Sequence, residues 1–324
     1  MDRTAFIQLL KNNNERMELF FGSDVQSNAR IPLAVQFTFS RETFNGPLFE
    51  RNVKDIHNQK SKQSFFEFFS TPSNKSVLTY KMLAHFVLHP QPEQELQRVE
   101  LNEKALLNAG FKSSGYQRIA AIFLMDEAHA KSAKILHDEM KKHHYFLTGK
   151  DDIPYAVLLT KKQGDPVKLA ETMRKYYDAL HSKDFKNGDA LQAMTQLLPL
   201  YDEEFQPVLV DYVVAMKQSF INSGVKVKKS FYPYLALLAL AGATSEVVGE
   251  IVEMEHALIK LPMFNEMQAY ALMTAAQYVL KNLVENDTLS EFNDSLLFMQ
   301  ALAISDYIGD VPILLAIDIL DIFF

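Results

Sequence analysis

Two adjacent carboxylates near the middle of the chain are the residues whose types and spacing most suggest chemistry. Asp151 and Asp152 follow Gly149 and Lys150 in the stretch 143–159. Paired carboxylates can act as general acid and base or bind a cation. The same pair fits a helix start, where Asp151 would cap free N–H groups and Asp152 would face the positive end of the helix dipole. We interpret the pair as a helix start, and Lys150, Asp151 and Asp152 are the candidate binding residues if this turn is functional.

Acidic residues placed three positions before histidines form a second candidate. Asp126 with His129, and Glu253 with His256, have a spacing that places both side chains on one helix face. Carboxylate-bridged pairs of metal ions in helix bundles use two such motifs and two further carboxylates. Nothing in the sequence selects the further carboxylates. We therefore favour a solvent-exposed role for these four residues, predict no cofactor, and keep a metal site as the alternative.

Complete motifs of the common enzyme classes are missing. The chain has no cysteine, which excludes disulfides, thiolate metal sites and cysteine nucleophiles. His85 and His89 are four residues apart, but Phe86 stands where the zinc-protease motif has a glutamate. The stretch 148–150 has the composition of a phosphate-loop end but lacks the upstream glycine and strand, and there is no Gly-x-Ser-x-Gly motif. The sequence therefore favours a protein that is not an enzyme.

The charge balance limits the classes of partner. The formal net charge of −7 argues against a general nucleic-acid binder, which needs a basic surface to displace counterions. The chain has short lysine runs: Lys141 with Lys142, Lys161 with Lys162, and Lys226, Lys228 and Lys229. They would form a basic binding surface only if folding gathered them on one face. No stretch offers about 18 uncharged apolar residues, so no membrane span is predicted. The start of the chain does not read as a signal peptide, and with the missing cysteine we predict a cytoplasmic protein.

The elements that must position these residues are helices. Gly and Pro number only 11 and 12, and 48% of the residues are hydrophobic, which favours long helices around a sizeable core. Around the acidic pair, one helix is expected to end in lysines and histidines, with Gly149 as its left-handed cap. The next helix is expected to begin after Asp151, with Pro154 in its first turn, where a missing N–H is tolerated.

The same helix–turn–helix plan recurs along the chain. Its apolar helices contain alanines at spacings of 36, 37, 43 and 35 residues, namely Ala120, Ala156, Ala193, Ala236 and Ala271. Two helices of about a dozen residues with two short loops fill such a length. We therefore predict an all-α fold of stacked helical hairpins, either an α-solenoid or a curved bundle. Residues 1–105 fit this plan poorly and form a predicted N-terminal subdomain before a hairpin body at 106–324, unless the chain is one continuous domain.

Two segments of the chain resemble a known family. The stretches 110–121, Gly-Phe-Lys-Ser-Ser-Gly-Tyr-Gln-Arg-Ile-Ala-Ala, and 146–159, Phe-Leu-Thr-Gly-Lys-Asp-Asp-Ile-Pro-Tyr-Ala-Val-Leu-Leu, are similar to a bacterial family, domain of unknown function 4003. The resemblance covers most of the chain. It implies a bacterial, cytoplasmic protein with one long helical domain. It implies no activity, so no catalytic residue is carried over.

These observations lead to one leading hypothesis and two others. Stacked hairpins form concave surfaces, so we predict a binding or scaffold module that holds a partner protein or peptide on a concave helical face. The alternative is an enzyme or small-molecule sensor with a pocket between helices, in one version metal-dependent. A third interpretation is a homo-oligomer that forms through the apolar C-terminal helices of residues 294–324.

Overall fold

The computed structural model describes residues 1–22, 25–58, 77–143, 147–162, 164–289, 292 and 294–309. Every regular element within these ranges is a helix, so the predicted all-α class is confirmed. The chain forms two compact units. The described part of the first unit is Met1–Leu101 with Leu261–Met267, and that of the second unit lies within Asn102–Lys260 and residues 268–309. None of the described helices has the length and apolar content needed to cross a membrane.

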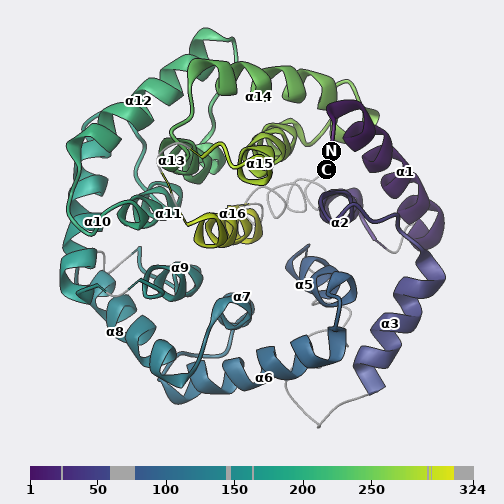
Figure 1. Ribbon diagram of the computed structural model, residues 1–324, viewed down its shortest axis with the longest axis horizontal. Helices are drawn as coiled ribbons and strands as arrows, with labels where there is room; N and C mark the ends of the chain where they lie inside the picture. The colour runs from purple at the N-terminus through teal and green to yellow at the C-terminus, as the bar shows by residue number, and fades with distance from the viewer. Residues whose placement is uncertain are drawn as a thin grey trace, which may run out of the picture. The chain divides into compact units, whose positions relative to one another are not determined.

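The first unit is built from four helices and the start of a fifth. In chain order they are α1 (Arg3–Phe21), α2 (Ser27–Phe39), α3 (Gly46–Asn58), α5 (Val77–Leu88) and α6 (Pro92–Asn108) (Figure 1). Helix α2 packs against α1 and α5, and α3 contacts both of these helices. Aromatic rings fill the space between them: Phe44 lies 5.3 Å from Phe37, 5.6 Å from Phe21 and 5.5 Å from Phe49, measured between ring centroids.

The asparagine run at positions 12–14 does not interrupt α1, although asparagine is a poor helix former. Asn13 is fully buried, and its side-chain amide connects α1 to the end of α2 and the loop that follows. The amide donates to Thr38 Oγ1 at 3.1 Å and to the carbonyl of Glu42 at 3.0 Å. Its oxygen accepts from the backbone N–H of Phe44 at 2.8 Å. A helix-breaking residue type is kept here because its polar groups are satisfied by distant backbone.

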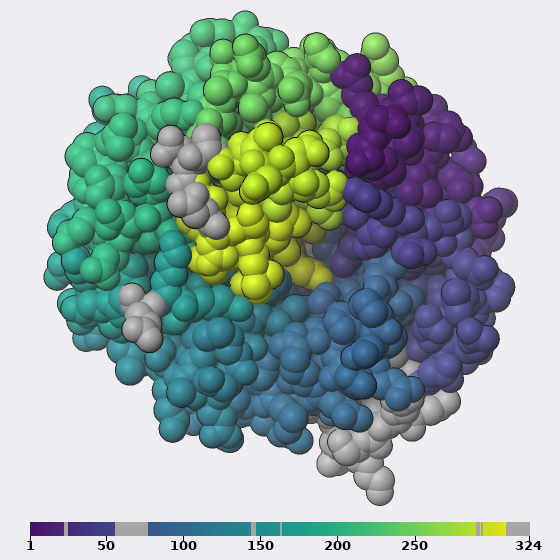
Figure 2. Space-filling view, viewed as in Figure 1, coloured from purple at the N-terminus to yellow at the C-terminus, as the bar shows by residue number. Residues whose placement is uncertain are grey.

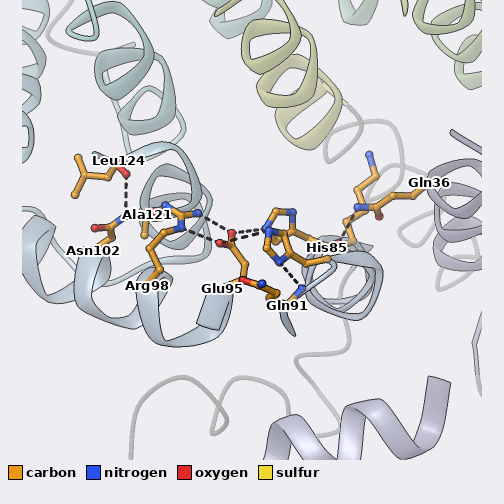
Figure 3. Close-up of polar contacts among 10 residues, drawn as sticks. Gln36, His85, Gln91, Glu95, Arg98, Asn102, Ala121 and Leu124 are labelled. Carbon is orange, nitrogen blue, oxygen red and sulfur yellow. Dashed lines mark hydrogen bonds and ion pairs between the residues drawn. The ribbon is translucent and has the colours of Figure 1, made fainter. Parts of the chain in front are cut away.

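A polar cluster joins α5 to α6 within the first unit (Figure 3). His85 Nε2 lies 2.8 Å from Glu95 Oε1, and the Arg98 guanidinium donates to both oxygens of Glu95 at 2.7 and 2.6 Å. Burial alone would raise the pKa of the Glu95 carboxyl, but hydrogen bonds and charge from His85 and Arg98 lower it to about 2. The carboxylate of Glu95 is therefore held ionised between two helices.

The second unit arranges its helices in an outer and an inner layer (Figure 1). The outer helices are α8 (Glu127–His143), α10 (Pro166–His181), α12 (Pro207–Asn222) and α14 (Ser245–Leu258). The inner helices are α7 (Gly115–Phe123), α9 (Ile153–Leu159), α11 (Asp189–Leu197), α13 (Tyr232–Leu240) and α15 (Gln268–Glu285). A last helix, α16 (Ser295–Gly309), packs on α7, α9, α13 and α15.

The two layers follow from their sequences. Outer helices are amphipathic: α8, for example, buries His129, Ala130, Ala133, Leu136 and Met140 along one side. The inner helices α9 and α13 are short, and every one of their residues is buried. The five alanines that marked the recurrence all lie on inner helices, one on each. A regular solenoid repeat remains a prediction.

The end of α6 and the start of the inner layer are connected by buried polar groups. The Asn102 amide donates to the carbonyls of Ala121 and Leu124, both at 2.9 Å (Figure 3). Arg118 Nε donates to Glu103 Oε1 at 2.9 Å, and both of these side chains are more than nine-tenths buried. These contacts fix α7 against the last turns of α6.

Helix α16 buries its apolar residues within its own unit. Leu297, Phe298, Ala301 and Ile304 are almost inaccessible, whereas Leu296 is 71% exposed. In Figure 2 this helix, drawn in yellow, lies on the face toward the viewer. The rest of the predicted C-terminal oligomerisation segment, residues 310–324, lies outside the described residues.

Candidate binding site

The acidic pair lies in the turn between α8 and α9, but it does not cap a helix in the predicted way. The residue that precedes α9 is Asp152, not Asp151, and the side chain of Asp152 makes no bond to the first turn. Its backbone is already helical, at φ −83° and ψ −13°, so its carboxyl is not positioned for capping. Gly149 is likewise not a left-handed cap, because it is absent from the glycines that have positive φ among the described residues.

The carboxyl of Asp152 instead connects three segments of the second unit. Only 4% of Asp152 is exposed. Its Oδ2 accepts from the backbone N–H of Gly149 at 2.7 Å. Its Oδ1 accepts from Gln192 Nε2 at 3.1 Å and from Gln196 Nε2 at 2.5 Å, which binds the turn to α11.

Gln192 and Gln196 are functional candidates that our sequence interpretation missed. They lie four residues apart on one side of α11, and 3% and 1% of their surfaces are exposed. Gln192 also donates to Thr148 Oγ1 at 3.2 Å. The side-chain carbonyl oxygens of both glutamines are buried and have no hydrogen-bond partner among the described residues. Two glutamines at this spacing, between the apolar residues of α11, were the available signal, since unpaired amides are seldom buried.

Three carboxyls gather at this place, and we call Asp151, Asp152 and Asp189 the acid cluster. Burial, the charge of Asp151 and, more weakly, Asp189 raise the pKa of Asp152 to about 8, against the opposing hydrogen bonds from Gln196 and Gly149. Burial and the charge of Asp189 also raise the pKa of Asp151. The Tyr116 hydroxyl on α7 has a pKa raised by burial and by Asp151 and Asp189. The cluster therefore lies where α7, α9 and α11 begin.

The acid cluster has no cationic partner within the part of the chain that the structure describes. Asp152 receives hydrogen bonds from neutral groups only. Neither Asp151 nor Asp189 forms a salt bridge with a described residue, and Lys150 is exposed without an ion pair to any of the three. Asp151 is partly accessible and Asp189 is exposed, so a ligand could reach the outer two carboxyls. The arrangement can accept a positively charged group from solvent.

The polar region continues from the acid cluster toward α16. Tyr155 lies one turn beyond Asp152 on α9, and burial together with the charges of Asp152 and Asp151 raises the pKa of its hydroxyl. The nearby Ser305 hydroxyl on α16 opposes this rise in the pKa of Tyr155. Both are buried, and neither makes a hydrogen bond of normal geometry.

We expected the first pair, Asp126 and His129, to be solvent-exposed. This is wrong for His129, which is only 5% exposed, and both residues serve the local structure of the second unit. Asp126 Oδ1 accepts from the backbone N–H of His129 at 2.8 Å, as an N-terminal cap of α8. His129 Nδ1 accepts from the N–H of Met125 at 3.2 Å, so Nε2 carries the proton and donates to the carbonyl of Val157 at 2.8 Å. Burial lowers the pKa of His129, in agreement with a neutral ring. Both ring nitrogens are therefore engaged.

The second pair, Glu253 and His256, lies on α14. The His256 side chain is 57% exposed, and its Nε2 lies 3.8 Å from Glu255 Oε2. The structure does not bring the two pairs into one site: across the described ranges, no three His, Cys, Asp or Glu side chains are grouped so that they could hold a metal ion.

The comparisons with known proteins identify a family but no activity. Residues 15–304 match the family model described as Protein of unknown function (DUF4003). A protein of Bacillus subtilis (strain 168), "Uncharacterized protein YeaA", is 26% identical over 178 residues. That alignment covers 52% of this chain and 54% of the relative, about half of each. No solved structure matches. Because the family model covers most of the chain, acid cluster included, this protein belongs to the DUF4003 family.

Proposed function

We propose that the protein is a binding module that holds a basic side chain of a partner protein or peptide at the acid cluster. One observation carries the proposal: a buried carboxyl, Asp152, lies beside two further carboxyls, and only neutral groups of the described chain contact it. A lysine or arginine side chain would supply the missing charge. The concave helical face predicted from the sequence is where we expect the partner to bind.

The electrostatics explain why a cation is favoured. Bringing a positive group near Asp151 and Asp189 stabilises their ionised forms, whereas without it each charge disfavours the other. The buried carboxyl of Asp152 has a pKa of about 8 and is mostly protonated at neutral pH. A cation at the cluster would lower that pKa and release the proton. Affinity is therefore expected to rise between pH 6 and pH 8, with proton release on binding.

Lys150 can compete with a basic ligand for the acid cluster. Its ammonium group is exposed on the residue next to Asp151 and can approach the same carboxyls from solvent. A basic ligand would have to displace it or bind beside it. Replacing Lys150 with glutamine should therefore strengthen binding, by about twofold to fivefold for one exposed charge.

The test measures binding of a labelled arginine-rich peptide by fluorescence anisotropy. Isothermal titration calorimetry in two buffers of different ionisation enthalpy measures the protons released on binding. Asp151→Asn/Asp189→Asn should weaken binding by about tenfold or more, since each charged contact contributes on the order of 1 kcal/mol. A matched control is Asp211→Asn/Glu250→Gln, two exposed acids on α12 and α14 that change the net charge equally. Equal loss in both double variants would mean nonspecific attraction and would refute the proposal.

A second candidate function is an acid–base enzyme that uses the same carboxyls. The observation in its favour is the pKa of Asp152, about 8, which suits a proton donor at neutral pH. Its near-complete burial argues for binding, because a substrate must reach the reacting group. Mass spectrometry of the peptide after incubation separates the two: an unchanged peptide favours binding, and a modified peptide favours the enzyme.

We also propose a cytoplasmic location and a protein or peptide as the partner. The missing cysteine suits a reducing compartment. Fractionation of the native host, with a cytoplasmic and a secreted marker, tests the location.

A further inference from the structure

A pocket of about 300 Å³ lies within the second unit, away from the three residues of the acid cluster. Three segments line it: the chain from Gly224 to Phe231, the end of α14, and the first turns of α15. This volume is at the lower limit of pockets that hold small organic ligands. Its lining therefore indicates which ligand chemistry it could accept.

Two lysines of the run 226–229 gather at this pocket. Lys226 and Lys228 both line it, both are exposed, and neither forms a salt bridge with a described residue. The third, Lys229, is held elsewhere, because its Nζ donates to the carbonyl of Asn187 at 3.0 Å. Buried residues on either side, Val225 and Phe231, anchor the loop. The fold thus directs two uncompensated positive charges to one cavity.

The start of α15 adds to the positive potential of this pocket. Gln268 and Ala269 line the cavity, and the N–H groups of a first turn have no acceptor within their own helix. No acidic residue occurs in that turn, and the helix has 18 residues. The first turn itself adds no negative charge, although Glu266, two residues before the helix, offsets part of the positive end of its dipole.

One acidic side chain, Glu255, also lines the pocket. Glu255 is 13% exposed, and its Oε2 lies 3.8 Å from His256 Nε2. Burial disfavours the charged form of this carboxyl. Phe231, Ile259 and Leu272 contribute apolar wall, and Ser230 contributes a hydroxyl.

We propose that this pocket binds a small organic anion, a phosphate ester or carboxylate with an apolar body. The anionic group would contact Lys226, Lys228 and the first-turn N–H groups of α15, and the body would pack on Phe231 and Leu272. The proposal does not depend on the function of the acid cluster. It gives the protein a second, small-molecule site of opposite charge preference.

The test titrates the full chain with phenyl phosphate, benzoate, inorganic phosphate and neutral phenol by isothermal calorimetry. Saturable binding of phenyl phosphate or benzoate is expected, and whichever binds more tightly identifies the anionic group. Phenol should bind at least tenfold more weakly because it carries no anion. Inorganic phosphate should also bind more weakly because it lacks the apolar body. Equal binding of phenol, or no saturation by either organic anion up to 10 mM (about the weakest affinity that calorimetry resolves) would overturn the proposal.

Variants connect the binding to the pocket. Lys226→Gln/Lys228→Gln should weaken binding by about tenfold or more, whereas the exposed control pair Lys183→Gln/Lys186→Gln should leave it within about twofold. A second variant, Ala269→Phe, fills the cavity and should abolish binding with the lysines intact. Circular dichroism and the melting temperature check that each variant is folded. Unchanged affinity in the folded lysine variant or in the folded Ala269 variant would overturn the proposal.

Discussion

Replacing Asp152 with asparagine should make the stability of the protein less dependent on pH. The substitution keeps the size of the side chain and an oxygen that can accept from Gln196, but removes the ionisable group. In the folded protein the pKa of Asp152 is raised to about 8, from an ordinary value of 3.8. The unfolded chain therefore ionises first as pH rises, the folded chain holds more protons, and the free energy of unfolding falls with pH between these two values.

The size of the effect follows from the two pKa values. One proton changes the free energy of unfolding by at most about 1.4 kcal/mol per pH unit. Between pH 5 and pH 8, Asp152 should therefore reduce the stability of the wild-type protein by about 3 kcal/mol, after allowance for relaxation around a buried charge. The asparagine variant should be about as stable as the wild type at pH 5 and clearly more stable at pH 8.

Urea unfolding at half-unit steps from pH 5 to pH 8.5, followed by circular dichroism, measures the difference directly. Asp211→Asn is the control, because Asp211 is exposed on α12 and forms no salt bridge with a described residue. Its difference from the wild type should stay constant. If the difference between Asp152→Asn and the wild type is also constant within about 0.5 kcal/mol, the buried carboxyl does not titrate as described.

Three further outcomes test other parts of the structure. Asn13→Ala should lower the free energy of unfolding, measured by urea titration, by about 3 kcal/mol. The substitution removes three hydrogen bonds of a buried side chain and leaves the N–H of Phe44 unpaired. The control Asn12→Ala should cost little. Glu95→Gln should remove a stabilisation that is present above about pH 4.5 and is lost as pH falls toward 2. Between pH 7 and pH 3, the free energy of unfolding of the wild type should fall by about 2 kcal/mol more than that of the variant. Equal falls in both proteins would refute the role of His85. If the C-terminal segment mediates a homo-oligomer, a chain ending at Gly309 should form a smaller oligomer, as judged from its mass by light scattering. A folded variant with an unchanged number of subunits would refute that interpretation.

Helix periodicity and turn residues were sufficient to predict the class of the fold. The stretch 166–180 has its apolar residues at a helical spacing, and α10 spans Pro166–His181. The stretch 31–39 is apolar and partly β-branched, as a strand can be, but the sequence offers it no partner strand, and α2 covers it. These features depend on neighbours three or four residues away, which a sequence displays directly.

The site could be predicted only in part, because its partners come from distant positions. Asp151 and Asp152 were selected for their type, but their local context favoured a cap. The amides that bind Asp152 lie 40 and 44 residues further on, and their approach depends on how α9 packs against α11. The same limit applies to Asn13, whose acceptors and donor are 25 to 31 residues away. Composition shows which residues are unusual, and packing determines which groups satisfy them.

Four of the inner helices, α7, α9, α11 and α13, have only 7 to 9 residues, and this has a consequence for the order in which the second unit folds. A helix of 7 residues such as α9 cannot persist alone in water, since isolated helices need roughly 12 to 15 residues to be even marginally stable. Helices α8 and α10, with 17 and 16 residues, can form transiently before tertiary contacts exist. Because all side chains of α9 are buried, its amide hydrogens should exchange with solvent only when the whole unit opens. The residues of the acid cluster would thus be assembled last, since they depend on inner helices that exist only within the completed unit.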